Sequence, residues 1–148
     1  MIKIRQADEN DLGEIKILLK KLQESAEPHN EVTQIGFGKI FKEMNDFPHF
    51  YSNYVAVKDG DIIGFISIIF YKTLFHSGGT ALINELIVSE DYRRKGVGKK
   101  LISKAIKIAK QRGMDEIEVG TEKKNIIAQS FYKKCGFNNE YILLSKTF

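Results

Sequence analysis

The sequence predicts a single α/β domain with a mixed, mostly antiparallel sheet flanked by about four helices. A length of 148 residues fits one domain that can build its own hydrophobic core. Apolar residues alternate with polar ones in some segments, as in strands, and recur every three or four residues in others, as in helices. These segments follow the order β-α-α-β-β-β-α-β-α-β without a repeat or a linker, so we expect residues 1–148 to form one domain.

The N-terminal third predicts one short strand and two helices. Residues 2–4 alternate as in a strand, and Asp8 then has the position of a helix N-cap, with Asp11 three residues later. The first helix is predicted by apolar residues at helical spacing: Leu12, Ile15, Leu18, Leu19 and Leu22. A polar loop over residues 25–30 separates it from the second helix. That helix is predicted by Phe37, Ile40, Phe41 and Met44.

The middle of the chain predicts three strands. Tyr54–Val57 and Ile62–Tyr71 flank an Asp-Gly pair, which tolerates the positive φ of a tight turn and therefore predicts a hairpin. After a turn at residues 76–79, a third strand is expected from about Thr80 to Val88.

Helices and strands alternate in the remaining part of the chain. A helix is expected from about Gly98 to Arg112 and a strand around residues 117–119, so the chain makes a parallel, right-handed crossover between two strands. A shorter helix is predicted by the apolar stripe Ile127, Ala128, Phe131 and Cys135. Tyr141–Ser145 is expected to form a final strand.

The net charge of +4, from 23 Lys and Arg against 19 Asp and Glu, is unevenly distributed. Nine basic residues and no acid lie between Arg93 and Arg112, whereas residues 1–92 hold nine basic and fourteen acidic residues. This basic block predicts an anionic partner at one place. It lacks the interleaved aromatic residues of a nucleic-acid binder, so no nucleic-acid partner is expected. We expect its later part, Lys100–Arg112, to be a solvated helix face.

Composition excludes several classes of protein. With 43% hydrophobic residues and two prolines, the chain is not expected to be disordered. Its single cysteine, Cys135, excludes an internal disulfide and a multi-cysteine metal site, and we expect it in the core and no metal. The N-terminus lacks the apolar stretch of a signal peptide, and the longest nearly apolar run, Ile62–Phe70, is too short to span a membrane. A cytoplasmic domain without a membrane partner is expected.

The sharpest local pattern is the strand Leu82–Val88, a polar turn and the glycine-containing segment Arg93–Gly98 at the start of the basic helix. Glycines let the backbone approach a ligand, and free amides at a helix N-terminus favour an anion. A Walker loop would need glycine at position 93, which is Arg, and a dinucleotide fingerprint would need glycine at position 101, which is Leu. The pattern therefore predicts a phosphate-binding site that is neither a Walker loop nor a dinucleotide-binding loop.

Two separated motifs resemble those of the GNAT superfamily of acetyl-CoA-dependent N-acetyltransferases. Leu86–Gly98 matches a strand ending in L-x-V followed by R/Q-x-x-G-x-G/A. Asn125–Phe137 matches N-x-x-A-x-x-F-Y-x-x-x-G-F. The resemblance covers about residues 80–137 and implies a GNAT-like fold that binds acetyl-CoA as co-substrate.

The resemblance also implies which residues bind acetyl-CoA. The backbone of Leu86 and Val88 would pair with the pantetheine arm like an added strand, and Asn125 would hydrogen-bond to it. A bulge near positions 84–86 would splay two parallel strands to admit the cofactor. The pyrophosphate would be held by the loop and the start of the helix: Arg93, Arg94, Lys95, Gly96, Val97, Gly98 and Lys99. The side chain that reaches the phosphates, Arg94 or Lys95, stays open.

Catalysis in such a family consists of attack by a neutral amine on the thioester, with loss of coenzyme A thiolate. Tyr132 matches the tyrosine that protonates this thiolate, and its ordinary pKa of about 10 suits a general acid. The base that deprotonates the amine is Glu85, directly or through water, or His76, which precedes the same strand.

The acceptor predicted by these features is a small cationic amine, because residues 1–92 are acidic in excess. The alternatives are an acetyltransferase that acts on protein N-termini or lysines and a non-catalytic acyl-CoA-binding module with the same fold. Family members are often dimers, so a homodimer is also expected.

Overall fold

The computed structural model describes residues 1–25 and 36–148, without the side chains of residues 22–25. The predicted polar loop over residues 25–30 therefore lies outside the described residues, apart from the backbone of Ser25. Five strands form one sheet in the order β1-β2-β3-β4-β5. The strands are β1 (Lys3–Gln6), β2 (Tyr51–Lys58), β3 (Asp61–Thr73), β4 (His76–Val88) and β5 (Glu116–Val119). The helices are α1 (Leu12–Ser25), α2 (Phe37–Asp46), α3 (Val97–Gln111) and α4 (Ile126–Lys134), with 3-10 turns at Glu9–Asp11 and Glu90–Tyr92.

The sheet is mixed and mostly antiparallel, as predicted. Neighbouring strands from β1 to β4 run antiparallel, and β5 runs parallel to β4 after the crossover through α3. The β2–β3 turn has positive φ at both Asp59 (53°) and Gly60 (99°), which confirms the hairpin predicted from Asp-Gly.

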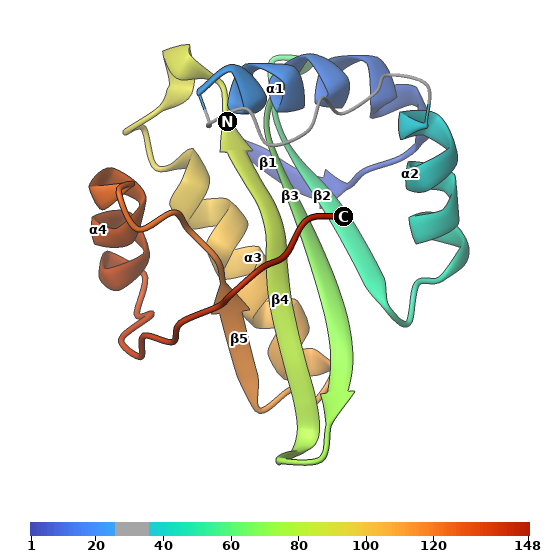
Figure 1. Ribbon diagram of the computed structural model, residues 1–148. Helices are drawn as coiled ribbons and strands as arrows, with labels where there is room; N and C mark the ends of the chain where they lie inside the picture. Colours follow the sequence, from blue (N-terminus) through green and yellow to red (C-terminus); the bar gives the residue numbers. More distant parts are fainter. Residues whose placement is uncertain (26–35) are drawn as a thin grey trace.

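Helices cover both faces of the sheet and enclose two cores (Figure 1). On one face, α3 packs Leu101 and Ala105 against strand residues that include Ile66. On the other face, Ile15 of α1 and Phe41 of α2 pack with Val55, Phe65 and Ile87. We call these the α3 face and the α1/α2 face.

Two predictions for the C-terminal part are wrong. No strand forms at Tyr141–Ser145, because a strand needs a hydrogen-bonded neighbour and this segment pairs with none of the described strands. Its apolar side chains are exposed instead, at 73% for Tyr141 and 90% for Ile142. In α4, Ile127 is exposed and the inward stripe includes Phe131, Tyr132 and Cys135.

No helix in the described part of the chain is both long and apolar enough to cross a lipid bilayer.

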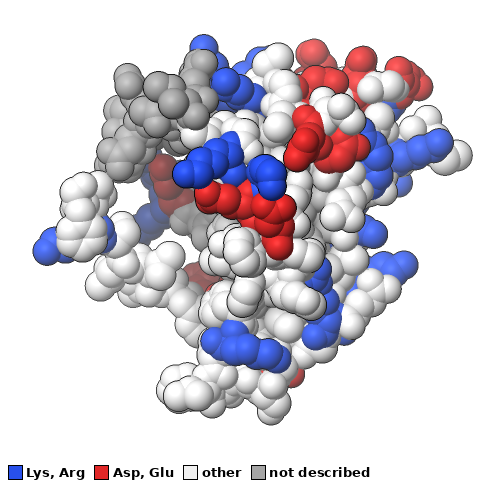
Figure 2. All heavy atoms as spheres, turned by 90° about the vertical axis from the view of Figure 1, so that its right-hand side faces the viewer, with Lys and Arg blue, Asp and Glu red and all other residues white. Residues whose placement is uncertain are grey.

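The acidic excess of residues 1–92 does not form a continuous acidic surface. Several of these carboxylates pair with cations nearby, among them Asp46 with Lys42 at 2.8 Å and Glu43 with Lys39 at 3.8 Å. Figure 2 shows acidic and basic side chains side by side on one face of the molecule.

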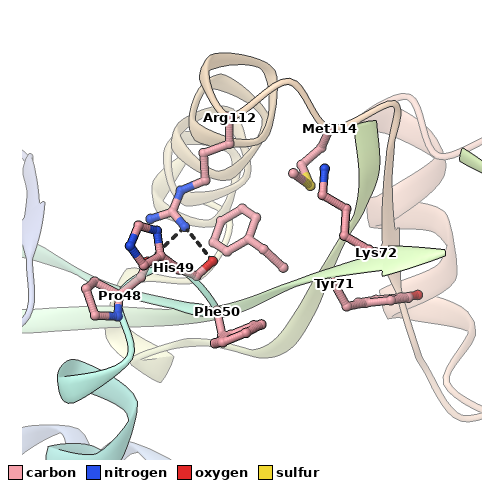
Figure 3. A pocket seen from close by; sticks show the side chains of 8 residues that line it. Pro48, His49, Phe50, Tyr71, Lys72, Arg112 and Met114 are labelled. Carbon is pink, nitrogen blue, oxygen red and sulfur yellow. Dashed lines mark hydrogen bonds between the residues drawn. The ribbon is translucent and has the colours of Figure 1, made fainter. Parts of the chain in front are cut away.

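Arg112, the residue directly after α3, is exposed as expected, but its guanidinium also fastens this end of the helix to β2 and to the segment before it. Its guanidinium donates to the carbonyls of Pro48 (2.9 Å) and His49 (3.1 Å) and to the Ser52 hydroxyl (2.9 Å). It also lies 4.0 Å from the centre of the Phe70 ring. These residues border a hollow of about 600 Å³ on the α3 face (Figure 3).

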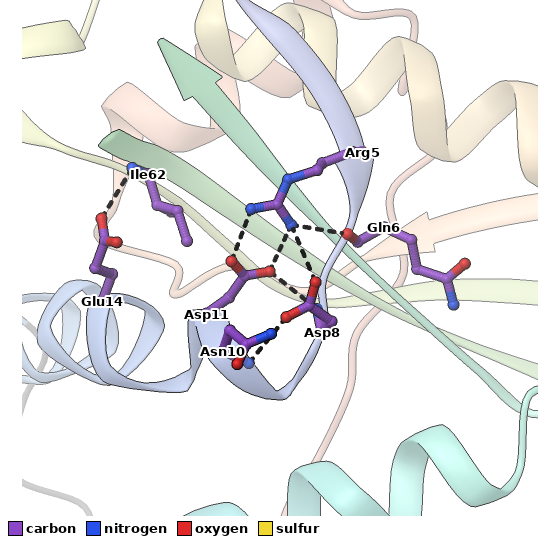
Figure 4. A network of polar contacts seen from close by, with 7 residues as sticks. All are labelled: Arg5, Gln6, Asp8, Asn10, Asp11, Glu14 and Ile62. Atoms are coloured by element: carbon purple, nitrogen blue, oxygen red, sulfur yellow. Dashed lines mark hydrogen bonds and ion pairs between the residues drawn. The ribbon is translucent and has the colours of Figure 1, made fainter. Parts of the chain in front are cut away.

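The start of the first helical segment has the capping box that the sequence predicts. Asp8 accepts from the Asn10 amide, and Asp11 accepts from the Asp8 amide at 2.9 Å. The buried Asp11 carboxylate also accepts two hydrogen bonds from Arg5, at 2.6 and 2.7 Å (Figure 4). This fork-like pair lowers the pKa of Asp11 and ties β1 to the helix start.

We expect Asp11→Asn to lower the free energy of unfolding at pH 7 by about 2 kcal/mol, because a charged hydrogen-bond pair is lost. The folded-state pKa of Asp11 is lowered, so its contribution is present above the unfolded pKa of about 3.9 and is lost as the pH falls through the folded value. Urea unfolding of both proteins should therefore show a difference at pH 7 that shrinks below about pH 4. Asp46→Asn, which breaks the exposed pair with Lys42, is the matched control and should change stability much less.

Candidate functional site

A bulge interrupts β4 near the middle of the sheet. Ser67 of β3 is opposite Glu85, and the next residue, Ile68, is opposite Ile83, so the pairing skips Asn84. This confirms the bulge near positions 84–86 that the family resemblance implies. Because of the extra residue, Ile83 and Glu85 lie on opposite faces of the sheet although they are two positions apart.

Beyond the bulge, one edge of β4 is open. The pairing between β4 and β5 ends at Ile83 and Val119, the last residue of β5. The rest of β4, Asn84–Val88, pairs with β3 on one side and with no described strand on the other. Leu86 and Val88 thus lie on a segment whose free backbone groups can pair with an extended ligand.

The open edge leads through a short turn to the N-terminus of α3. Gly96 is the N-cap, with a left-handed φ of 82°, and no side chain caps the helix. The amides of the first turn, which begins with Val97 and Gly98, therefore lack a side-chain acceptor. An uncapped helix N-terminus is a site for an anionic group.

The basic side chains of this loop point to different partners. Arg93 is exposed and folds back toward the end of β4, with Nε donating to the Val88 carbonyl at 3.2 Å and Nη1 3.5 Å from Glu90. Lys95 lies 5.5 Å from the centre of the Tyr92 ring. Arg94, with a φ of 60°, is exposed and makes no ion pair with any described residue. Arg94 and Lys95 are both exposed, so the structure leaves either side chain free to reach a ligand.

A hollow of about 460 Å³ adjoins the start of α3. Gly96, Lys99 and Lys100 line one side of it, and Ile4 of β1 and the preceding Ile2 also line it. Lys99 thus lies where a phosphate group at the helix N-terminus would be within its reach.

Helix α4 lies beside the start of α3. The closest approach is at Gly98, where an added Cβ would be 3.1 Å from Cζ of Phe131. Asn125 is the N-cap of α4, and its Oδ1 accepts from the Ala128 amide at 3.1 Å. The Nδ2 group of Asn125 makes no hydrogen bond to a described residue and can donate to pantetheine, and Oδ1 can accept one more hydrogen bond.

Tyr132 is half-buried on α4 and packs with Leu86, Val88 and Val97 in the core of the α3 face. Its ring contacts those of Phe131 and Phe137, with centroids 5.3 and 5.8 Å apart. Burial raises the pKa of Tyr132 above its ordinary value of 10, so the phenol stays protonated at neutral pH.

Glu85 is half-buried on the α1/α2 face, the side of the sheet opposite Tyr132. Burial raises the pKa of its carboxyl, and the Ser67 hydroxyl lowers it in part. A carboxylate with a raised pKa is a better proton acceptor at neutral pH than an ordinary one. Glu85 and Tyr132 thus flank the open edge of β4 from opposite faces.

His76 lies outside this arrangement. It forms the start of β4, nine residues before Glu85, which corresponds to about 30 Å along an extended strand. Its Nε2 is 3.1 Å from the Glu116 carboxylate. The alternative of His76 as the base is therefore wrong for a reaction at the open edge. Cys135 is partly buried against the α3-face core, and burial raises its thiol pKa.

A family model for acetyltransferases, described as the GNAT family, matches residues 16–137. The chain belongs to the GNAT acetyltransferase family. An uncharacterized N-acetyltransferase of Methanocaldococcus jannaschii is 30% identical to this GNAT chain over 121 residues, which cover 73% of this chain and 53% of the relative. The chain spans about half the length of the curated relatives that it matches.

Solved structures confirm the GNAT fold over the whole chain. A transcriptional regulator from Bacillus halodurans C-125 has a TM-score of 0.87 at 27% identity, with 100% of both chains covered. Glucosamine-6-phosphate N-acetyltransferase from Arabidopsis thaliana has a TM-score of 0.83 at 25% identity, with 100% of this chain and 99% of that chain covered.

Two polar residues beside Glu85, Asn53 and Ser67, belong to neither of the two motifs from which the site residues are predicted. Asn53 of β2 and Ser67 of β3 are buried in the α1/α2 face, at 2% and 0% exposure. A sequence signal for them exists, since each is a polar residue within or next to an apolar strand segment. Their relation to Glu85, however, depends on strand register, which the sequence does not reveal.

Proposed function

We propose that this GNAT chain is an N-acetyltransferase that moves the acetyl group of acetyl-CoA to a primary amine by direct attack in a ternary complex. The observation that carries the proposal is the open edge of β4, Asn84–Val88, which leads to the uncapped N-terminus of α3. An extended amide-containing arm can pair with the first, and a pyrophosphate fits the second. A thiol-release assay with acetyl-CoA and a panel of amines tests the proposal, and no release with any amine would contradict it.

The residues of the chain have distinct roles in this reaction. The backbone of Leu86 and Val88 holds the pantetheine arm, together with Nδ2 of Asn125. The amides at the start of α3, with Lys99 and with Arg94 or Lys95, hold the pyrophosphate, while Arg93 shapes the loop through Val88. Glu85 accepts a proton from the amine, directly or through water, and Tyr132 donates one to the departing thiolate.

A small cationic amine is the acceptor that we propose. The support is local: Glu85 is a half-buried carboxylate beside the open edge, where a cation gains from a nearby negative charge. One structural neighbour is named for glucosamine-6-phosphate, a small amine. The acidic excess of residues 1–92 adds little, because many of its members are paired with cations.

Two other functions give different results in the same assay. A non-catalytic acyl-CoA-binding module would bind acetyl-CoA in calorimetry but release no thiol with any amine. In such a module Tyr132→Phe would change neither the affinity for acetyl-CoA nor the absence of thiol release. An enzyme for protein N-termini or lysines would acetylate peptides with a higher kcat/KM than small amines.

We include a homodimer in the proposal, because the exposed apolar segment Tyr141–Leu144 would gain from burial in a partner.

We expect Gly96→Asp to weaken acetyl-CoA binding by at least about 10-fold, as measured by calorimetry. The φ of 82° favours glycine, and an added carboxylate would repel a pyrophosphate at the helix N-terminus. An added Cβ would meet no protein atom within 4 Å, so no clash with the described protein is expected at this atom. Gly96→Asn has a side chain of similar size without the charge and better tolerates positive φ, so it should bind more tightly than Gly96→Asp. Unchanged affinity in Gly96→Asp would remove this loop from the site.

A further inference from the structure

A polar row crosses three strands on the α1/α2 face and ends at Glu85. Asn53 of β2 is directly opposite Ser67 of β3, and Ser67 is directly opposite Glu85 of β4. Side chains at directly opposite positions of antiparallel strands have Cβ atoms about 5 Å apart. The amide, the hydroxyl and the carboxyl are therefore neighbours in that order, each within reach of the next.

The side chains of the two inner members of the row are buried without hydrogen bonds to any described residue. Asn53 is 2% exposed and Ser67 is 0% exposed. Within the described part of the chain, neither Nδ2 nor Oδ1 of Asn53 has a hydrogen-bond partner, and neither does the hydroxyl of Ser67. Buried polar groups without partners are rare and costly, so their presence beside a reactive group indicates a use for them. Glu85 is the one member of the row that is partly exposed.

We propose that Ser67 and Asn53 are positioning residues for Glu85. When the carboxylate is ionised, the Ser67 hydroxyl donates to it, and Nδ2 of Asn53 donates to the Ser67 oxygen. Each group then acts in a role that its chemistry allows, because an amide NH₂ only donates while a hydroxyl both donates and accepts. A chain of this kind orients the carboxylate toward the open edge of β4 and stabilises its negative charge. This inference rests on the proposed role of Glu85 as the base.

The direction of the effect agrees with this arrangement, since the nearby Ser67 hydroxyl lowers the pKa of Glu85 against the rise that burial causes. Several carboxylates on the elements that pack against β4 have other partners. Glu118 and Glu116 of β5 contact Tyr71 and His76, respectively, and Glu14 of α1 accepts from the Ile62 amide. The cations on the neighbouring helices include Lys16, Lys20 and Lys21 of α1 and Lys99 and Lys104 of α3, and Lys104 lies over the Tyr54 ring. Ser67 is the polar side chain directly opposite the carboxylate in the sheet.

Removal of the hydroxyl tests the proposal. We expect Ser67→Ala to raise the pKa of Glu85 by roughly half to one unit, the equivalent of the hydrogen bond that the proposal assigns to the ionised carboxylate. The acid limb of the kcat/KM profile should move to higher pH by the same amount. Asn53→Leu removes the second donor at similar volume and should cause a smaller shift in the same direction. Thr73→Val is the matched control, since it also removes a buried, unpartnered hydroxyl of β3 but lies outside the row.

Two readouts separate this inference from the proposed function. Carbon-13 NMR of the Glu85 carboxyl, assigned with Glu85→Gln, measures its pKa whether or not the protein transfers acetyl groups. An unchanged pKa in Ser67→Ala, or an equal shift in Thr73→Val, would overturn the positioning role. A shifted pKa with an unmoved kinetic limb would overturn it too, because the row would not act on the base of the reaction. If no amine is acetylated, the proposed function fails, and the NMR result still decides whether the row stabilises the carboxylate.

Discussion

We expect Glu85→Gln to lower kcat/KM for a small amine at neutral pH by about 100-fold to 10,000-fold, the range for loss of a general base. The substitution keeps the shape of the side chain and removes its ability to accept a proton from the ammonium group. The loss should shrink at high pH, where more of the amine is already neutral. Because burial raises the pKa of Glu85, the wild-type profile should rise with pH through a value above the ordinary 4.5, and this limb should vanish in the variant.

The control for this experiment is Glu116→Gln, which removes another partly buried carboxylate of the same sheet. Glu116 pairs with His76 at the far end of β4 and should leave the kinetics unchanged. Acetyl-CoA affinity should stay at the wild-type level in both variants. Wild-type kcat/KM in Glu85→Gln would assign proton removal to another group or to bulk water.

Tyr132→Phe should lower kcat by roughly 10-fold to 1000-fold with little change in acetyl-CoA affinity, as expected for loss of a general acid. The phenol is held by the rings of Phe131 and Phe137, and phenylalanine would retain these contacts. The raised pKa of Tyr132 keeps the proton in place across the neutral range, so the wild-type rate should not fall before strongly alkaline pH. Steady-state kinetics and calorimetry on the same preparation give both quantities.

Tyr71→Phe provides a comparison for this variant, because Tyr71 donates to Glu118 away from the open edge. It should retain wild-type kcat. If Tyr132→Phe also retained it, the thiolate would be protonated by solvent, and Tyr132 would be only a packing residue between α4 and the α3-face core.

The parts of the fold that the sequence predicts depend on local interactions. Asp59-Gly60 determines its own turn, and the stripe of α3 is visible because Leu101 and Ala105 lie one turn apart. The prediction of a final strand is wrong for the opposite reason. The apolar run from Tyr141 has the composition of a buried strand, but strand pairing depends on a neighbour that is distant in the sequence, and composition does not reveal that neighbour.

The candidate site also has residues that local motifs reveal and residues whose arrangement depends on the folded structure. Gly96, Asn125 and Tyr132 belong to contiguous motifs and can be located in the sequence. The choice between Arg94 and Lys95 as the side chain that reaches the phosphates depends on backbone geometry, and the φ of 60° at Arg94 is not encoded by a motif. The alignment of Ser67 with Glu85 depends on a bulge of one residue, and a shift of one position would place these side chains on different faces.

The close approach of Phe131 to Gly98 links two parts of the protein that otherwise look like separate modules. The residue after Phe131 is Tyr132, and Gly98 belongs to the first turn of the helix proposed to hold the pyrophosphate. A larger side chain at position 98 would require the Phe131 ring to move by a few tenths of an ångström. Protein engineers who exchange the 93–98 loop for that of another acetyltransferase would therefore do well to keep a small residue at position 98 or to adjust Phe131 with it, because the two segments are in close contact.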